Sequence, residues 1–141
     1  MKLGSNIKRK SFLWNLLPWI NQNTLQAIYP NIYLPSRIYD NLISSNPDPF
    51  NIARLKHEET HLIRAKLIGP FNFYFKYIFI PKFRFEEEIE ANKVAMKLIK
   101  SQGLTWNIKN TAKHLSSWLY FWPVTFTHAE ERLNEVWRKL Q

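Results

Sequence analysis

The pattern of apolar and polar residues is most clearly helical in the middle of the chain. Asp48 is a residue type that caps helices, Pro49 suits a first helical turn, and Gly69-Pro70 ends the segment. A second clear helix is predicted from Arg84 to Ser101, with Gly103 as its C-terminal stop. These two helices carry most of the residues with candidate chemistry.

The C-terminal part of the chain contains two further predicted helices. One covers the region from Thr111 to Tyr120 and breaks near Pro123. The other begins after Thr127 and runs to the end of the chain, because Thr127 and Glu130 have the spacing of a capping box.

Two segments rich in strand-forming or aromatic residues lie outside these helices. Residues 27–35 favour a strand, but Pro30 and Pro35 confine it to a short or edge strand. Residues 71–83 are strongly aromatic, and their periodicity assigns no secondary structure. Core packing is the favoured interpretation of these rings, and a hydrophobic substrate cleft or a membrane contact is the alternative.

The length of 141 residues is enough to bury one core but too short for two ordinary domains, and no internal repeat or linker divides the chain. The predicted fold class is therefore α+β, with one mainly helical domain over residues 1–141 and a small sheet. No stretch approaches the roughly 20 apolar residues that a helix needs to span a bilayer.

Composition narrows the class of protein further. The 10 Phe, 6 Tyr and 6 Trp predict a core filled largely by rings. The absence of cysteine excludes disulfides and cysteine-ligated metals, and it fits a reducing, cytoplasmic compartment.

The segment from Phe12 to Ile20 resembles a signal-peptide core, but Asn15 and Pro18 interrupt it and no small-residue cleavage site follows. We expect it to pack on the domain; an interfacial anchor is the alternative.

The chain is strongly basic, with 20 Lys and Arg against 11 Asp and Glu and a net charge of +9. This balance favours weak association with anionic partners, either nucleic acid or an acidic surface. The basic residues form no long run, and the tightest group is Lys8, Arg9 and Lys10. We interpret most of this charge as solubilising surface.

The central candidate for chemistry is His57-Glu58-Glu59-Thr60-His61, an H-E-x-x-H motif inside the first clear helix. Residues four apart lie on one face of a helix, so both imidazoles can reach the same ion. Glu58 is offset around the helix, where it can act on a metal-bound water instead of on the metal. The alternative is that the two histidines are ordinary polar residues of an exposed helix.

Two histidines leave a catalytic zinc ion one protein ligand short, and the second helix offers four glutamates. At 100° per residue, Glu88 shares the apolar face of that helix with Ala91, Asn92, Ala95, Leu98 and Ile99. Glu86 and Glu90 lie on the opposite, solvated face, and Glu87 lies on the flank. A carboxylate that points into a core is costly unless it is paired or binds a metal, so we predict that Glu88 is the third ligand.

Two features near Glu88 support this hypothesis. Asn92 follows one turn later on the same face and can hydrogen-bond a ligating histidine from outside the ligand set. Ala91 and Ala95 are small, which lets the two helices approach closely enough for three ligands to converge.

The two motifs together resemble those of the gluzincin metallopeptidases, in which H-E-x-x-H is followed by E-x-x-A-[DN]-x-x-A on a separate helix. The local match is similar to small ImmA/IrrE-like and phage-encoded peptidases. The resemblance implies a zincin-like metallopeptidase domain with His57, His61 and Glu88 as ligands of one Zn²⁺. It implies Glu58 as general base, and a short strand near 28–34 that lies over the active-site helix as an edge strand and pairs with substrate.

The resemblance places the metal-binding core at about residues 27–101 and leaves residues 104–141 as a C-terminal helical extension. It implies a zinc-dependent hydrolase of protein or peptide substrates, cytoplasmic and of viral or phage origin. The residue that stabilises the oxyanion is not identified; Tyr33, His114 and His128 are candidates by chemistry alone. A zinc-binding but inactive domain and a basic nucleic-acid-binding module are the competing hypotheses.

Overall fold

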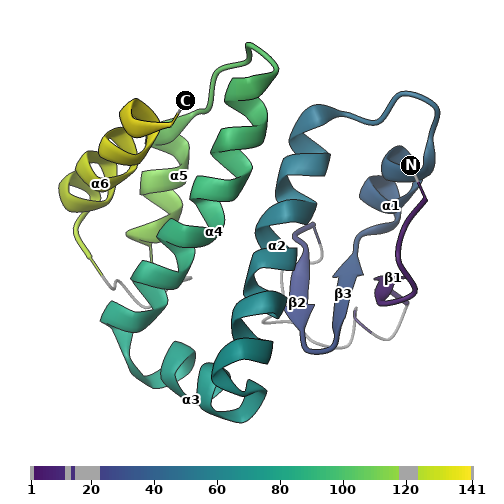
Figure 1. Cartoon of the computed structure of the whole chain (residues 1–141), viewed down its shortest axis with the longest axis horizontal. Coiled ribbons are helices and arrows are strands. Elements are labelled where there is room, and N and C mark those ends of the chain that lie inside the picture. Colours follow the sequence, from purple (N-terminus) through teal and green to yellow (C-terminus); the bar gives the residue numbers. More distant parts are fainter. Residues whose placement is uncertain (1, 12–13, 15–22, 118–123, 141) are drawn as a thin grey trace.

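The fold is that of a computed structural model, which describes residues 2–11, 14, 23–117 and 124–140. Within these residues it contains six helices and a three-stranded sheet, so the expected mainly helical α+β class is confirmed. The sheet lies on one side of helix α2 (Pro49–Ile68), and helices α4 (Pro81–Ser101), α5 (Ile108–Leu115) and α6 (Phe126–Lys139) lie on the other (Figure 1). No described helix is long and apolar enough to cross a membrane.

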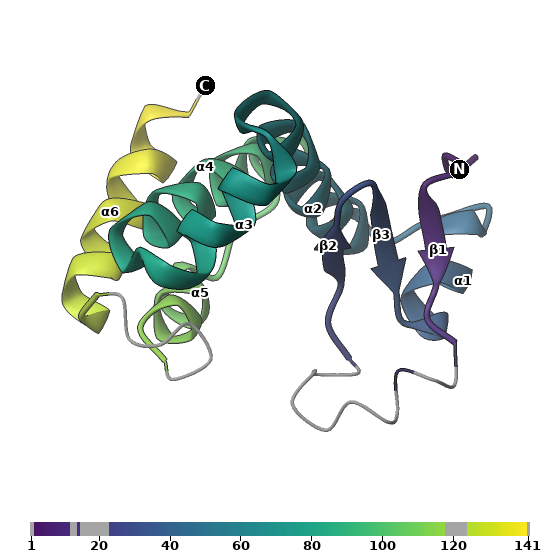
Figure 2. The ribbon, with the colours of Figure 1, turned by 90° about the horizontal axis from the view of Figure 1, so that it is seen from below.

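The region predicted as one strand forms a hairpin instead. Strand β2 (Gln26–Ile28) pairs antiparallel with β3 (Asn31–Leu34), and a cis Tyr29–Pro30 peptide bond lies in the turn. Strand β1 (Ile7–Arg9), which the sequence did not predict, pairs parallel with β3 and gives the order β1-β3-β2. Strand β3 is therefore central, and β2 is the edge strand that faces α2 (Figure 2).

Helix α2 begins and ends where its signals predict. The side chain of Asp48 accepts a hydrogen bond from the Phe50 amide at 2.9 Å, and Pro49 takes the first position. Gly69 has a φ of 91°, a conformation that side-chain-bearing residues avoid, and it joins α2 directly to α3 (Pro70–Phe79). The aromatic stretch that periodicity left unassigned is thus largely helical.

The remaining boundaries differ from those predicted. Helix α4 begins at Pro81 instead of Arg84, and α5 begins at Ile108 because the Asn107 side chain caps it, accepting from the Asn110 amide at 3.0 Å. Helix α5 ends at Leu115, and residues 118–123 lie outside the described part. The cap of α6 is Thr125, not Thr127, so the predicted capping box is wrong. Helix α1 (Ser36–Ile43) was not predicted.

Buried apolar side chains form one cluster on each side of α2 and a third, small cluster between α2 and α4. The sheet, α1 and α2 share the first cluster, and α4, α5 and α6 share the second around Phe85, Ile89 and Met96. Ala53 of α2 packs with Ala95 and Ile99 of α4, all fully buried. The small side chains let the two helices approach closely, as the sequence predicted. Segment 12–20 lies outside the described residues apart from Trp14.

Candidate metal centre

Helix α2 directs two imidazole rings toward the same point. His57 and His61 are one turn apart on its inner face, and their Nε2 atoms are 3.2 Å apart. His61 is buried and its ring lies against Phe73 and Tyr77 of α3. His57 is more accessible from the adjoining cleft. The i,i+4 spacing of the motif therefore produces the expected convergence.

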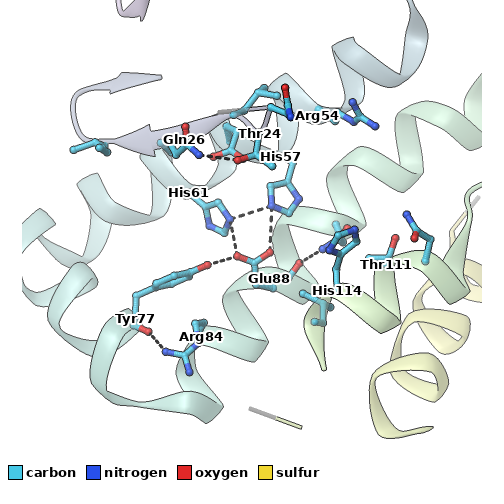
Figure 3. Close-up of a pocket in the computed structure, with 18 of the residues that line it drawn as sticks. Thr24, Gln26, Arg54, His57, His61, Tyr77, Arg84, Glu88, Thr111 and His114 are labelled. Atoms are coloured by element: carbon cyan, nitrogen blue, oxygen red, sulfur yellow. Dashed lines mark hydrogen bonds and ion pairs between the residues drawn. The ribbon is translucent and has the colours of Figure 1, made fainter. Parts of the chain in front are cut away.

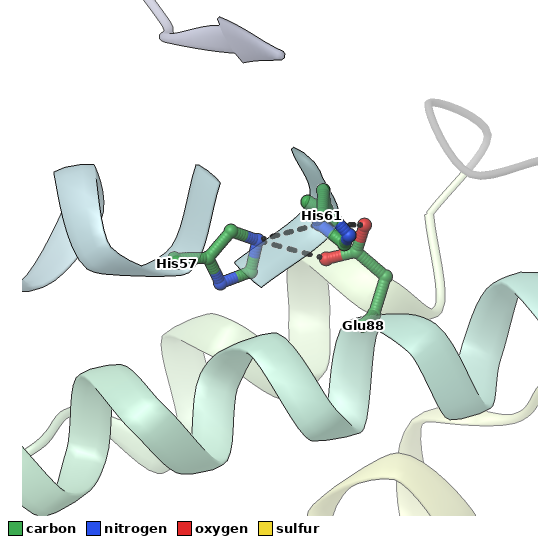
Figure 4. A group of neighbouring side chains, drawn as sticks. All are labelled: His57, His61 and Glu88. Atoms are coloured by element: carbon green, nitrogen blue, oxygen red, sulfur yellow. Dashed lines mark hydrogen bonds and ion pairs between the residues drawn. The ribbon is translucent and has the colours of Figure 1, made fainter. Parts of the chain in front are cut away.

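Helix α4 brings a carboxylate to the same point, although Glu88 is 27 or more residues away along the chain. Glu88 is 2% exposed, with Oε2 at 3.3 Å from Nε2 of His57 and Oε1 at 3.3 Å from Nε2 of His61 (Figure 4). Burial acts to raise the pKa of Glu88, but the neighbouring His61 and His57 hold it well below the usual range. Glu88 thus remains a carboxylate in an almost dry environment.

The helical-wheel assignment of the other glutamates is correct for two of three. Glu86 and Glu90 are exposed, as predicted. Glu87, predicted to lie on the flank, is as buried as Glu88. Arg64 of α2 compensates it through two hydrogen bonds, one of them from Nη2 to Oε1 at 2.6 Å. The error arises because Arg64, on the facing helix, covers a position that the sequence of α4 leaves at the edge of the apolar face.

The spacing of the three side chains fits a tetrahedral metal ion. Nitrogen and oxygen ligands held about 2.0–2.1 Å from such an ion lie about 3.3 Å from one another. The two Nε2 atoms are 3.2 Å apart, and each lies 3.3 Å from a different carboxylate oxygen of Glu88. Glu88 Oε2 is buried without a hydrogen bond, and so is His61 Nδ1. His57, His61 and Glu88 can therefore hold a metal ion.

Tyr77 is a member of this centre that the sequence did not reveal. Its phenol donates a hydrogen bond to Glu88 Oε1 (Figure 3). Arg84 of α4 holds the end of α3 in place by donating to the carbonyls of Tyr77 and Ile78 at 2.7 and 3.0 Å. Tyr77 belongs to the aromatic stretch, and the sequence does not show which of its rings faces Glu88 until α3 is known to be a helix.

The predicted partner of Asn92 is not the one observed. Asn92 is buried on the inner face of α4, but its Nδ2 donates to the backbone carbonyl of Glu88 at 2.8 Å and not to a histidine. This bond tightens the turn that carries Glu88. Asn92 therefore acts on the centre through the backbone of the ligand helix.

Glu58 lies beside the three-residue centre, facing the edge strand β2. Burial raises the pKa of Glu58 to about 7. The Glu88 carboxylate adds to this rise, whereas His57, a hydrogen bond from the Ala27 backbone and Lys10 act against it. A carboxyl group with a pKa near neutrality is suited to accept and return a proton at physiological pH.

Tyr74 of α3 covers the outer edge of β2. Its hydroxyl accepts a hydrogen bond from the Tyr29 amide at 2.8 Å and donates to the Ala27 carbonyl at 3.3 Å. Together with the bond from Ala27 to Glu58, these contacts satisfy the backbone groups that β2 turns away from β3.

The candidate ligands and their neighbours line one cleft with a cavity volume of about 710 Å³ (Figure 3). The neighbours in this lining are Glu58, Tyr74, Tyr77, Arg84 and Asn92. The walls of the cleft come from β2, α2, α3, α4 and α5. His114 of α5 lines the cleft, whereas the other two candidates for stabilising an oxyanion, Tyr33 and His128, are absent from its described lining. Tyr33 packs on Trp14, and His128 packs on Phe85.

The described side chains thus define a His–His–Glu group that can hold a metal ion, with a second glutamate, Glu58, in the same cleft. Comparisons with protein-family models, with curated proteins and with solved structures found no match. The function of this protein is therefore inferred from its own residues.

Proposed function

We propose that this protein is a zinc-dependent metallopeptidase with a zincin-like domain. The observation that carries the proposal is the convergence of His57, His61 and Glu88, whose ligand atoms all lie within 4.8 Å of one another, next to Glu58 in one cleft. A site with three protein ligands leaves the fourth tetrahedral position open, which is typical of catalytic zinc and not of structural zinc.

The donor set favours zinc over other common metal ions. Two imidazole nitrogens and one carboxylate oxygen are ligands that zinc accepts readily, whereas calcium and magnesium prefer oxygen alone. The buried position of Glu88 and His61 adds a low-dielectric environment in which an uncompensated carboxylate would be costly. A divalent cation offsets that cost.

A bound zinc ion supplies Lewis-acid chemistry, lowering the pKa of a coordinated water and polarising the scissile carbonyl group. The protein supplies the proton transfers. Glu58 accepts a proton from the water as the water oxygen attacks the carbonyl carbon of the peptide. Glu58 then gives that proton to the leaving nitrogen as the C–N bond breaks. Tyr77 and Asn92 hold the side chain and the backbone of Glu88 in place during the reaction.

The edge strand next to Glu58 supports a peptide as substrate. An extended chain can add to a sheet edge through backbone hydrogen bonds, and β2 is an edge strand that lines the cleft. The groups concerned are those of Ala27 and Tyr29, which Glu58 and Tyr74 now cover. A substrate strand would take over these bonds and place its carbonyl groups beside Glu58.

The first test is the metal content of the purified full chain after reconstitution with zinc. We expect one zinc per chain, lost in His61→Ala and in Glu88→Ala. His128→Ala and Glu86→Ala are matched controls, because His128 packs on Phe85 away from the cleft and Glu86 is exposed on α4. Both controls should keep the metal. A wild-type chain that binds no zinc would contradict the proposal and leave nucleic-acid binding, suggested by the net charge of +9, as the hypothesis to test.

The second test separates catalysis from metal binding. The zinc-loaded chain is incubated with a mixture of peptides of random sequence, and cleavage is followed by mass spectrometry. Glu58→Gln should bind zinc like the wild type and lose at least about a hundredfold in rate, since general-base catalysis typically contributes 10²–10⁴. Zinc binding without cleavage by the wild type would leave an inactive zinc domain.

A further inference from the structure

The outer face of α3 is apolar and uncovered among the described residues. Phe71, Phe75, Ile78 and Phe79 follow one another at helical spacing and are 86, 53, 56 and 67% exposed. We call these four side chains the outer face of α3. The opposite side of the same helix carries Phe73, Tyr74 and Tyr77, which line the cleft, and Ile78 lies at the border because it also lines the cleft. A helix with apolar side chains on two sides is normally covered on both.

This finding corrects the interpretation of the aromatic stretch as core. Phe73 is buried, but Phe71 is the most exposed large apolar side chain among the described residues. The rings of Phe75 and Phe79 contact each other at 5.0 Å between centroids. Helix α3 forms the lower end of the molecule in Figure 1 and lies in front in Figure 2. Because all four of its side chains are more than half exposed, the outer face is a projecting ridge and not a groove.

The charged residues next to the outer face of α3 in the sequence are all basic. No acidic residue occurs between Glu59 and Glu86, whereas Lys66, Lys76 and Lys82 lie in the last turn of α2, in α3 and in the first turn of α4. None of these three lysines forms an ion pair with a described residue. Arg64 of α2 does form an ion pair, and its partner is Glu87.

We propose that the outer face of α3 docks this protein on an anionic phospholipid surface. Exposed phenylalanines flanked by lysines are the composition of helices that lie in the membrane interface, where rings enter the acyl boundary and ammonium groups meet lipid phosphates. A lipid surface accepts a convex ridge without a complementary groove. A second copy of the chain is less suited, because its equivalent lysines would face these three.

Docking in this orientation would have a consequence for the cleft. Tyr74 and Tyr77 project from the other side of α3 toward β2 and Glu88. The candidate metal centre would therefore be held within one helix diameter of the lipid surface, on the order of 10 Å. Segments of membrane-attached proteins close to the bilayer would be the peptides within reach.

The test is co-sedimentation of the full chain with vesicles at low ionic strength. One set of vesicles contains phosphatidylcholine alone, and the other contains equal parts of phosphatidylcholine and phosphatidylglycerol. We expect binding to the mixed vesicles and much weaker binding to phosphatidylcholine. The triple variant Phe71→Ser, Phe75→Ser, Phe79→Ser should lose binding to both. The triple variant Lys66→Gln, Lys76→Gln, Lys82→Gln should bind mixed vesicles on the order of a hundredfold more weakly, at roughly fivefold per lysine.

Matched controls separate a docking face from general stickiness. Ile43→Ser, Val94→Ser, Phe126→Ser removes exposed apolar side chains of α1, α4 and α6, and Lys97→Gln, Lys109→Gln, Lys113→Gln removes exposed lysines of α4 and α5. The apolar control should bind like the wild type, and the lysine control should lose at most a few-fold through the change in net charge. Far-ultraviolet circular dichroism checks that every variant is folded.

Three results would overturn the proposal. The first is absence of binding to mixed vesicles, and the second is binding that the Phe71, Phe75 and Phe79 substitutions leave unchanged. The third is self-association of the wild type without vesicle binding, measured by sedimentation velocity and abolished by these substitutions, which would assign the ridge to a second copy. The proposal is independent of the hydrolase function, because Glu58→Gln and the zinc-free chain should bind vesicles like the wild type.

Discussion

The Tyr77 phenol donates a hydrogen bond to Glu88 Oε1, the same oxygen that lies 3.3 Å from His61 Nε2. One carboxylate oxygen is thus shared between α2, which carries the histidine, and α3, which carries the phenol. The contact links the helix with the exposed aromatic ridge to the candidate ligand set. It also restricts the rotation of the Glu88 side chain before any metal binds.

Removal of this hydroxyl should weaken metal binding without abolishing it. We expect Tyr77→Phe to bind zinc about 10–100-fold more weakly than the wild type, the usual cost of losing a group that orients a ligand. Competition with a chromogenic chelator measures this. Tyr39→Phe is the control, since Tyr39 lies on α1 beside Arg9. Unchanged affinity in Tyr77→Phe would mean that packing alone positions Glu88.

The raised pKa of Glu58 predicts how the stability of the metal-free protein depends on pH. The folded-state pKa of about 7 lies above the ordinary value of 4.5. Between these values the unfolded chain releases the proton and the folded chain retains it, so the free energy of unfolding falls as pH rises through this window. We expect Glu58→Gln to become more stable than the wild type above pH 7, by on the order of 2–3 kcal/mol.

Urea unfolding at a series of pH values tests this, in the presence of a chelator. Glu59→Gln serves as control because Glu59 is the adjacent glutamate and pairs with Lys56 on the surface of α2. That variant should follow the wild-type pH profile. A Glu58→Gln profile parallel to the wild type at all pH values would show that burial does not raise the Glu58 pKa.

The Tyr74 hydroxyl covers the edge of β2, so we expect its removal to lower stability without weakening substrate binding. Tyr74→Phe removes the group that accepts from the Tyr29 amide and donates to the Ala27 carbonyl. We expect the free energy of unfolding to fall by about 1 kcal/mol. If a peptide pairs with this edge, KM should fall, since the substrate no longer displaces the hydroxyl, and kcat should stay the same. A higher KM would instead make Tyr74 a substrate-binding residue.

The ion pair between Arg64 and Glu87 should contribute far more to the free energy of unfolding than the ion pairs on the surface. Glu87 is 2% exposed, so Arg64→Ala leaves a buried carboxylate without its partner, at a cost of about 2–4 kcal/mol. Arg132→Ala is the matched control because Arg132 pairs with the exposed Glu86 and should cost less than about 1 kcal/mol. Chemical denaturation of both variants compares them. Equal costs would mean that water reaches Glu87 when Arg64 is absent.

Local sequence rules predicted the ligand helices and the inward orientation of Glu88. The i,i+4 spacing brings His57 and His61 together in any helix, and the apolar face of α4 brings Glu88 inward with Ala91 and Ala95. Asp48 and Gly69 end α2 where expected because capping and positive φ depend on neighbouring residues alone. The cap of α6 was misassigned because Thr125 and Thr127 both lie at its start, and local spacing does not show which of them caps the helix.

Contacts between distant segments decided the rest. Whether Glu87 is buried depends on Arg64 of the facing helix, and β3 becomes the central strand because β1, which is distant in the sequence, pairs with its free edge. The roles of Tyr74 and Tyr77 arise because Gly69 turns α3 back over the cleft, so one side of an aromatic helix meets Glu88 and β2 while the other meets solvent. Hydrophobicity along the chain is the same for both sides of α3, and burial is a property of the packed molecule.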